Sequence, residues 1–256
     1  MSLYWNIMDT KKELKLFGLL GRNISYSFSK GYFEKKFETL KLENYDYINF
    51  DISSIEEFSS LWKKHTISGM NVTIPYKEEV ISKLDSLDAT AAAIGAVNTI
   101  KLLSDGTLRG YNTDCVGFRD SLEPLLDSHH QKALLLGTGG ASKAVAYVLE
   151  QLGIEYQYVS RKKSKSQLTY NELTESVMVD HAVIINCSPL GTFPKIEEKP
   201  DIPFEFLTAN HLLFDLIYNP SKTTFLKIGE EKGCKIQNGY DMLVGQAEAS
   251  WDLWSS

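Results

Sequence analysis

The sequence predicts an α/β fold in two domains, the second of them built on a parallel sheet. Three observations support this prediction. The chain has 256 residues, a length typical of one large domain or two small ones. A polar stretch at residues 127–132, shortly after Pro124, is typical of a domain boundary, and we expect its His129 and His130 to be exposed. Beyond it, apolar strands alternate with helices, which is typical of a parallel sheet covered on both faces.

The first half of the chain is expected to contain several short strands and helices. Five apolar or alternating runs predict strands, at residues 16–20, 45–50, 68–73, 99–103 and 107–111. Helices are expected around residues 32–37 and 54–65, and Lys77 is expected to begin another helix. Ser54 and Glu57 have the spacing of a capping box, which begins the second helix. Asp105-Gly106 lies between the last two strands and is a strong hairpin signal.

The second half is expected to repeat one pattern of strand and helix. Strands are predicted at residues 132–136, 155–159, 183–185 and 212–216. Helices are predicted at 141–152 and 241–254, and Thr113-Asp114 is expected to cap another helix that runs toward Glu123. We therefore expect the chain to cross between the domains within residues 112–131.

Composition excludes several classes of function. The chain has 27 basic and 33 acidic residues and a net charge of −6, which argues against a general nucleic-acid partner. It has no apolar run long enough for a membrane helix, and its first fifteen residues lack the apolar core of a secretory signal. The three cysteines form no CxxC pair and the five histidines no HExxH motif, so we expect no metal site and a cytoplasmic location.

A glycine-rich turn follows the first predicted strand of the second domain. Residues 134–149 read LLLGTGGASKAVAYVL, with Gly137, Gly139 and Gly140 between strand and helix. Glycines there permit a tight turn and let backbone N–H groups approach a pyrophosphate, whose charge a helix N-terminus favours. Ser142 holds the last position of the usual GxGxxG pattern, so plain packing stays an alternative. The flanking strand and helix favour a nucleotide.

The end of the next strand predicts which nucleotide. NAD-binding turns usually have an acidic residue there, which binds the ribose 2′-hydroxyl. This strand instead ends in Ser160, Arg161, Lys162 and Lys163, with no carboxylate. Because guanidinium and ammonium groups suit a 2′-phosphate, the sequence favours NADP(H) over NAD(H). A solvated run of charges is the alternative interpretation.

Polar residues also collect at the predicted strand ends of the first domain. They include one ammonium group, Lys77, one carboxylate, Asp114, and the amides of Asn71 and Asn98. Each of these groups alone is compatible with a turn, a cap or a surface ion pair. Together they place an acid–base pair and hydrogen-bonding groups in one domain.

Eight segments of the chain match a known family in order and spacing, and together they are highly specific. They are SFS at 27–29, NVTIPYK at 71–77, AVNT at 96–99, GYNTD at 110–114, GTGGAS at 137–142, NCS at 186–188, DLIYNP at 215–220 and GYDMLVGQ at 239–246. By these segments the chain resembles the shikimate dehydrogenase family from about residue 16 to residue 254.

The resemblance implies a fold, a reaction and a set of site residues. It implies a substrate-binding catalytic domain (1–118), a Rossmann-type NADP-binding domain (119–236) and a C-terminal helix (237–256) that packs back on the first domain. The implied reaction is the reversible, NADPH-dependent reduction of 3-dehydroshikimate to shikimate, in aromatic amino-acid (chorismate) biosynthesis. The implied partner is this small anionic substrate, and the protein would be a monomer or homodimer.

Residue roles follow from the same resemblance. Lys77 and Asp114 would be the catalytic pair. The substrate would be held by Ser27, Ser29, Asn71, Thr73, Lys77, Asn98, Asp114, Tyr218 and Gln246. NADP(H) would be bound by Gly137, Thr138, Gly139, Gly140, Ala141, Ser160, Arg161, Lys162, Cys187, Ser188, Gly239 and Met242.

The chain departs from the family pattern at a few positions. Tyr26 replaces a usual histidine and Lys30 a usual proline, and both can alter the pocket wall. Ser160 replaces an asparagine, and the short tail after Gln246 can trim the last helix. Two alternatives stay open: a quinate/shikimate dehydrogenase that also uses NAD, and a nucleotide-binding homologue without activity. Arg161 and Lys162 argue against the first, and the retained Lys77 and Asp114 against the second.

Overall fold

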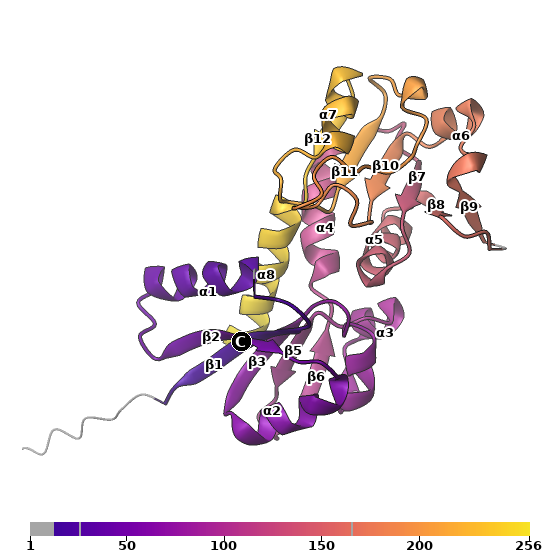
Figure 1. Ribbon diagram of the computed structural model, residues 1–256. Helices are drawn as coiled ribbons and strands as arrows, with labels where there is room; N and C mark the ends of the chain where they lie inside the picture. Colours follow the sequence, from indigo (N-terminus) through magenta and orange to yellow (C-terminus); the bar gives the residue numbers. More distant parts are fainter. Residues whose placement is uncertain (1–12, 26, 165) are drawn as a thin grey trace, which may run out of the picture.

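The computed structural model describes residues 13–25, 27–164 and 166–256. The expectation about a secretory signal at the N-terminus and the substitution at Tyr26 lie outside the described residues. The remainder forms two lobes, each with its own sheet of six strands (Figure 1). The predicted two-sheet α/β architecture is therefore confirmed.

The first sheet is mixed and has the strand order β2-β1-β3-β5-β6-β4. Its first three strands are parallel, β5 is antiparallel to both β3 and β6, and β4 is parallel to β6. The strands are β1 (Lys15–Gly21), β2 (Tyr45–Asp51), β3 (Ile67–Val72), β4 (Ser86–Leu87), β5 (Thr99–Leu102) and β6 (Leu108–Tyr111). The helices of this half are α1 (Phe28–Thr39), α2 (Phe58–Lys64) and α3 (Ala89–Ile94), with 3-10 turns η1 (Ile55–Glu57) and η2 (Glu79–Lys83).

The second sheet is entirely parallel, as predicted, with the order β12-β11-β10-β7-β8-β9. Its strands are β7 (Lys132–Leu136), β8 (Glu155–Ser160), β9 (Gln167–Thr169), β10 (Val183–Asn186), β11 (Leu212–Asp215) and β12 (Lys235–Gln237). The connecting helices are α5 (Gly140–Gln151), α6 (Glu175–Asp180) and α7 (Thr224–Glu231), and the 3-10 turns of this half are η3 (Glu123–Leu125), η4 (Tyr170–Glu172) and η5 (Phe204–Phe206). The chain runs outward from β7 to β9 and then returns to β10, so the strand order reverses between β7 and β10. Open parallel sheets bind ligands at this reversal, beyond the carboxyl ends of the strands.

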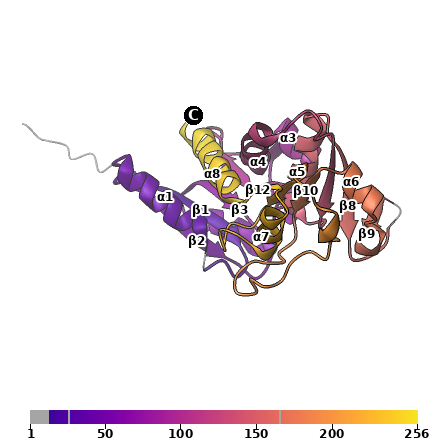
Figure 2. The same ribbon diagram turned by 90° about the horizontal axis from the view of Figure 1, so that it is seen from above.

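Two helices connect the lobes: α4 (Asp114–Leu122) and α8 (Tyr240–Ser255) lie side by side between them (Figures 1 and 2). Gly117 allows this close approach, since a Cβ atom there would lie 2.2 Å from the backbone oxygen of Met242. Farther along α8, the indole of Trp254 donates to the backbone oxygen of Ile100 at 3.0 Å. The last helix therefore contacts the first sheet although it follows the second in sequence, and it extends to Ser255.

Several local predictions differ from the structure. The capping box of Ser54 and Glu57 is present, but it begins the 3-10 turn η1, and α2 follows. Thr113 precedes α4 without a side-chain capping bond, because its hydroxyl bonds to Asn98 instead. Lys77, expected to begin a helix, lies in a turn before η2. In the described part of the chain, no helix combines the length and apolar character needed to cross a bilayer.

Candidate active site

The two residues predicted to be catalytic, Lys77 and Asp114, lie next to each other beyond the carboxyl ends of β3 and β6. Lys77 follows β3 and Asp114 is the first residue of α4, and Lys77 Nζ lies 2.6 Å from Asp114 Oδ2. Both side chains are mostly buried, at 15% and 9% exposed. The pair can therefore hold and orient a proton next to a bound ligand with little competition from water.

Asn98 fixes the other oxygen of Asp114. Its amide nitrogen donates to Asp114 Oδ1 at 2.9 Å and to Thr113 Oγ1 at 3.0 Å. Its amide oxygen accepts from the backbone N–H of Thr113 at 2.6 Å. Because Asn98 is only 2% exposed, these bonds lock the start of α4 against the end of the AVNT segment.

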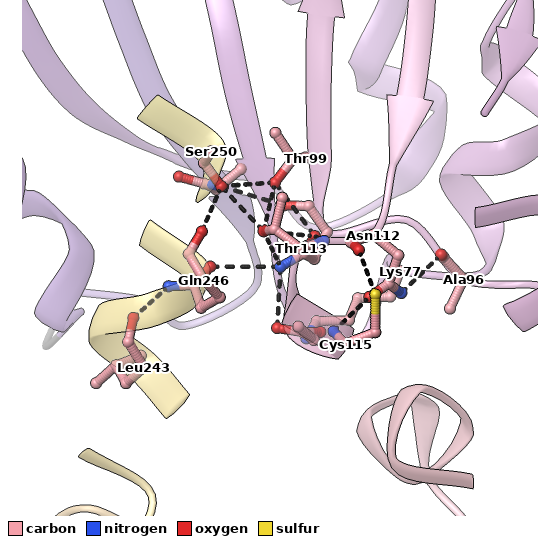
Figure 3. Close-up of polar contacts among 12 residues, drawn as sticks. Lys77, Ala96, Thr99, Asn112, Thr113, Cys115, Leu243, Gln246 and Ser250 are labelled. Atoms are coloured by element: carbon pink, nitrogen blue, oxygen red, sulfur yellow. Dashed lines mark hydrogen bonds and ion pairs between the residues drawn. The ribbon is translucent and has the colours of Figure 1, made fainter. Parts of the chain in front are cut away.

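A second set of hydrogen bonds connects this site to α8. Ser250 is fully buried and accepts from Asn71 Nδ2 at 2.9 Å. Its hydroxyl also lies 2.8 Å from Thr99 Oγ1 and 3.0 Å from Thr113 Oγ1, and it donates to the backbone oxygen of Gln246 (Figure 3). The last helix is therefore bonded directly to the residues that position Asp114.

A cleft of about 330 Å³ opens beside this network, between the two lobes. All nine residues expected to bind substrate line it, and so do three of those expected to bind cofactor. These twelve are Ser27, Ser29, Asn71, Thr73, Lys77, Asn98, Asp114, Ala141, Tyr218, Gly239, Met242 and Gln246. Residues far apart in the sequence thus converge on one cavity.

Ser27 and Ser29 have two local roles. Ser27 is the N-cap of α1, and its hydroxyl accepts from the backbone N–H of Ser29 at 3.1 Å. Both serines also line the cleft, so capping and ligand contact are compatible at this position. Lys30, expected to alter the pocket wall, instead pairs with Glu34 on α1 and does not line the cleft.

The glycine-rich turn connects β7 to α5 at the reversal of the second sheet. Gly137 has φ 114°, which a residue with a side chain rarely adopts, and lies against the backbone of Cys187. The N-cap of α5, Gly139, makes no side-chain capping bond. The first N–H groups of α5 therefore suit an anionic ligand such as a pyrophosphate. Thr138 and Gly139 are exposed, and Gly140 faces the stem of Lys77, which places this turn beside the catalytic pair.

The strand end next to this turn carries the expected cations. Ser160 ends β8, and its hydroxyl accepts from the backbone N–H of Lys162 at 3.2 Å. Arg161 and Lys162 are exposed and form no ion pair within the described residues, whereas Lys163 pairs with Glu172. Two cations beside the nucleotide turn thus have no acidic partner in that part of the chain.

The loop after β10 is backed by a buried carboxylate. Asn186 accepts from the backbone and hydroxyl of Ser188, at 3.0 and 2.7 Å, and donates to Asp215 at 3.0 Å. Thr223 and the backbone of Ile217 also donate to Asp215, which is fully buried. Burial raises the pKa of Asp215 to about 6, although these three hydrogen bonds act in the opposite direction. Burial also raises the pKa of the Cys187 thiol, which therefore stays protonated.

Several residues of this site were not predicted from the sequence. Ser250 and Tyr47 are buried in the polar network, and Arg22 lines the cleft. The i, i+4 spacing of Gln246 and Ser250 on one helix is the signal that could have identified Ser250. Nothing in the local sequence of Tyr47 or Arg22 indicates which way either side chain points.

One cluster away from the cleft has the composition of a metal site. Asp127, His129 and His130 place ligand atoms within 4.8 Å of one another. His130 is buried, which corrects the expectation of an exposed histidine pair, and its Nδ1 accepts from the backbone of Asp127. Lys235 Nζ lies 2.5 Å from the Asp127 carboxylate, and His129 Nε2 lies 3.0 Å from the backbone oxygen of Asn210, so each of the three residues already bonds to a protein group.

Comparisons with known proteins agree with this geometry. Residues 19–100 match the family model described as the shikimate dehydrogenase substrate binding domain. The shikimate dehydrogenase (NADP(+)) of Methanococcus vannielii is 34% identical over 97% of this chain and 93% of its own length. The chain belongs to the shikimate dehydrogenase family.

Solved structures of the family have the same fold. Shikimate dehydrogenase 1 of Peptoclostridium difficile is 38% identical, with a TM-score of 0.82 over 94% of this chain and 92% of its own. The Thermus thermophilus enzyme, determined in complex with NADP(H) and shikimate, is 29% identical, with a TM-score of 0.83 over 94% of each chain. The family fold thus extends over both lobes and the cleft between them.

Proposed function

We propose that this protein catalyses the reversible reduction of 3-dehydroshikimate to shikimate with NADPH, a step of aromatic amino-acid biosynthesis. The observation that carries the proposal is the buried Lys77–Asp114 pair, 2.6 Å apart in the cleft of a member of this family. The names of the relatives support NADP as the cofactor and shikimate as the substrate.

Lys77 is the proposed proton donor. Its ammonium polarises the substrate carbonyl and delivers a proton to the oxygen, and its neutral form accepts that proton in the reverse direction. Asp114 orients the ammonium and accepts a hydrogen bond from a substrate hydroxyl. Asn98 holds Asp114 in place, because it donates to the carboxylate oxygen that Lys77 does not contact.

The remaining cleft residues would hold the substrate. Hydroxyl and amide groups suit a carboxylate and several hydroxyls, and buried groups left unpaired by a wrong ligand make such a pocket selective. We assign this role to Ser27, Ser29, Asn71, Thr73, Asn98, Tyr218 and Gln246.

The second lobe would hold NADP(H), which supplies the hydride when bound. We assign the pyrophosphate to Gly137, Thr138, Gly139, Gly140 and Ala141, and the 2′-phosphate to Ser160, Arg161 and Lys162. Cys187, Ser188, Gly239 and Met242 would lie along the rest of the cofactor. The uncapped start of α5 supports this assignment, and so do Arg161 and Lys162, which have no acidic partner within the described residues.

The chain would divide into the three segments that the family resemblance implies. Residues 1–118 would bind substrate, residues 119–236 would bind NADP(H), and residues 237–256 would return to the first domain. Contacts between α8 and the first sheet support the last assignment. A cytoplasmic monomer or homodimer stays a prediction from the sequence alone.

The two alternatives are less well supported. A quinate/shikimate enzyme that also uses NAD does not account for Arg161 and Lys162 at the end of β8. A homologue without activity has no chemical need for the Lys77–Asp114 pair. The relatives reported above are named as NADP or shikimate enzymes.

The test is to mix the protein with 3-dehydroshikimate and NADPH and to follow the nicotinamide absorbance. We expect oxidation of NADPH that requires the substrate, and a loss of roughly 10²–10⁴-fold in kcat for Lys77→Ala. Lys83→Ala is the matched control, because Lys83 pairs with Glu56 away from the cleft. Normal turnover by Lys77→Ala would refute its role, and binding of NADPH without turnover by the wild type would favour the inactive homologue.

A further inference from the structure

The charges that line the cleft do not balance. Arg22, Lys77 and Asp114 are its charged lining residues. Lys77 and Asp114 neutralise each other at 2.6 Å, which leaves the positive charge of Arg22. No acidic group of the described residues forms an ion pair with Arg22. The cleft therefore carries a surplus of one positive charge in a chain whose net charge is −6.

The carboxylate of Asp51 bonds to the backbone that follows Arg22 and not to the Arg22 guanidinium. Asp51 ends β2, and its carboxylate oxygens accept from the backbone N–H groups of Asn23 and Ile24, at 2.9 and 3.2 Å. These bonds shape the chain just after Arg22 and leave the guanidinium to other partners.

The guanidinium of Arg22 is held along one edge. Its Nε donates to the hydroxyl of Tyr76 at 3.2 Å, and its Nη2 donates to the backbone oxygen of Ser53 at 2.7 Å. The guanidinium carbon lies 5.4 Å from the centre of the Tyr76 ring. Tyr76 is fully buried and donates to the backbone oxygen of Ile52, so this support is rigid.

Two of the five guanidinium N–H groups therefore have protein acceptors in the described chain, and three remain for a ligand or water. A positive charge fixed at the rim of a cleft attracts an anion before contact and favours it after contact. Ser27 and Ser29 are neutral donors, which bind a carboxylate or its ester with less discrimination.

We propose that Arg22 is a specificity-determining residue that makes the cleft prefer a carboxylate substrate over an uncharged analogue. This inference rests on the proposed function, which supplies the carboxylate. Arg22 contributes to capture and binding of the substrate, and Lys77 and Asp114 act on the carbonyl. Removal of Arg22 therefore lowers kcat/KM for the acid, mainly through KM.

The test compares two substrates in the oxidation direction with NADP+: shikimate and its methyl ester. Arg22→Gln removes the charge but keeps an amide that can donate to Ser53, and Arg22→Lys keeps the charge. Arg109→Gln is the matched control, because Arg109 also lies over a tyrosine ring, 5.6 Å from the centre of Tyr111, but does not line the cleft. Both glutamine variants change the net charge of the chain equally.

We expect Arg22→Gln to lower kcat/KM for shikimate roughly tenfold at low ionic strength and to leave that for the ester nearly unchanged. At saturating NADP+, the wild type should lose kcat/KM for shikimate as salt is added, because ions screen the rim charge, and Arg22→Gln should lose much less. Arg22→Lys should keep most of the salt dependence, and Arg109→Gln should behave as the wild type.

Each of the following outcomes would overturn the inference about Arg22. Equal losses for acid and ester would assign Arg22 a structural role only. A raised KM for NADP+ with an unchanged KM for shikimate would assign it to the cofactor. If the wild type oxidises shikimate and Arg22→Gln matches it, the inference fails and the proposed function stands. If the wild type oxidises neither compound, the proposed function fails as well.

Discussion

The two halves of the candidate site are built differently. In the substrate half, the groups that face the cleft are held by buried side chains with several partners each, such as Asn98, Asn71 and Ser250. In the nucleotide half, the expected contacts are backbone N–H groups of a turn and two exposed cations, Arg161 and Lys162. Two buried side chains also support this half: Asp215 bonds to the loop of Asn186 and Ser188, and Ser142 donates to the backbone oxygen of Gly139.

This difference predicts how binding and folding are coupled. A polar residue in a buried network both stabilises the fold and positions the ligand. Its replacement therefore lowers the free energy of unfolding and weakens ligand binding. An exposed cation contributes little to the fold, so its removal affects the ligand alone. The variants below test the comparison in order of their expected effect on the free energy of unfolding.

The largest loss is expected for Asn98→Ala. The backbone N–H of Thr113 and the Asp114 carboxylate lose their Asn98 partners, and a buried cavity remains. We expect the free energy of unfolding to fall by about 2–4 kcal/mol, measured by urea denaturation. We also expect kcat/KM to fall at least tenfold.

Ser188→Ala is the control from the nucleotide half. Its hydroxyl donates to Asn186 at 2.7 Å, but Ser188 is only half-buried. Its loss should cost about 1 kcal/mol or less. If Asn98→Ala and Ser188→Ala lowered the free energy of unfolding equally, the two halves of the site would not differ in the way described above.

The sequence predicted the strands that are long and apolar and the motifs with fixed spacing. It did not predict β4, β9 or β12, because two or three residues carry too little periodicity to be recognised. The convergence on the cleft was predicted only through the family resemblance. Ser250 was missed because its role depends on the packing of α8 against α4, which Gly117 permits and which no local pattern reveals.

His130 illustrates the same limit. Its polar neighbours, residues 127–132, predicted an exposed segment, and His129 is exposed. The fold nevertheless buries His130 and uses its Nδ1 to accept from the backbone of Asp127. Burial of a single side chain within a polar loop depends on tertiary contacts, which a composition pattern does not contain.

Asp215→Asn is expected to have an intermediate effect on the free energy of unfolding, and this effect depends on pH. Burial raises the pKa of Asp215 from 3.8 to about 6, so the folded protein holds a proton that the unfolded chain releases. The stability that this proton provides is complete below about pH 4 and is lost as the pH rises through 6. The whole difference is about 3 kcal/mol, at about 1.4 kcal/mol per pH unit between the two pKa values, and roughly half of it lies between pH 5 and pH 7.5.

Asparagine cannot release this proton. The free energy of unfolding of Asp215→Asn, minus that of the wild type, should therefore rise by about 1–2 kcal/mol between about pH 5 and pH 7.5. Denaturation curves at several pH values measure this difference. A difference independent of pH would contradict the raised pKa of Asp215.

The smallest change in stability, with a large change in binding, is expected when Arg161 and Lys162 are both replaced by alanine. Neither cation has an acidic partner in the described chain, so the free energy of unfolding should stay within about 0.5 kcal/mol of the wild type. If the two side chains bind the 2′-phosphate, KM for NADPH should rise roughly 10–100-fold. KM for NADH should change little, because NADH lacks that phosphate.

Lys163→Ala is the matched control for this variant, because its ammonium already pairs with Glu172. We expect it to leave KM for NADPH within about threefold of the wild-type value. Equal increases in KM for NADPH and NADH would mean that Arg161 and Lys162 do not distinguish the two cofactors. A fall of more than about 1 kcal/mol in the free energy of unfolding would mean that Arg161 and Lys162 stabilise the fold as well as bind the ligand, as Asn98 does. The two halves of the site would then not differ in this respect.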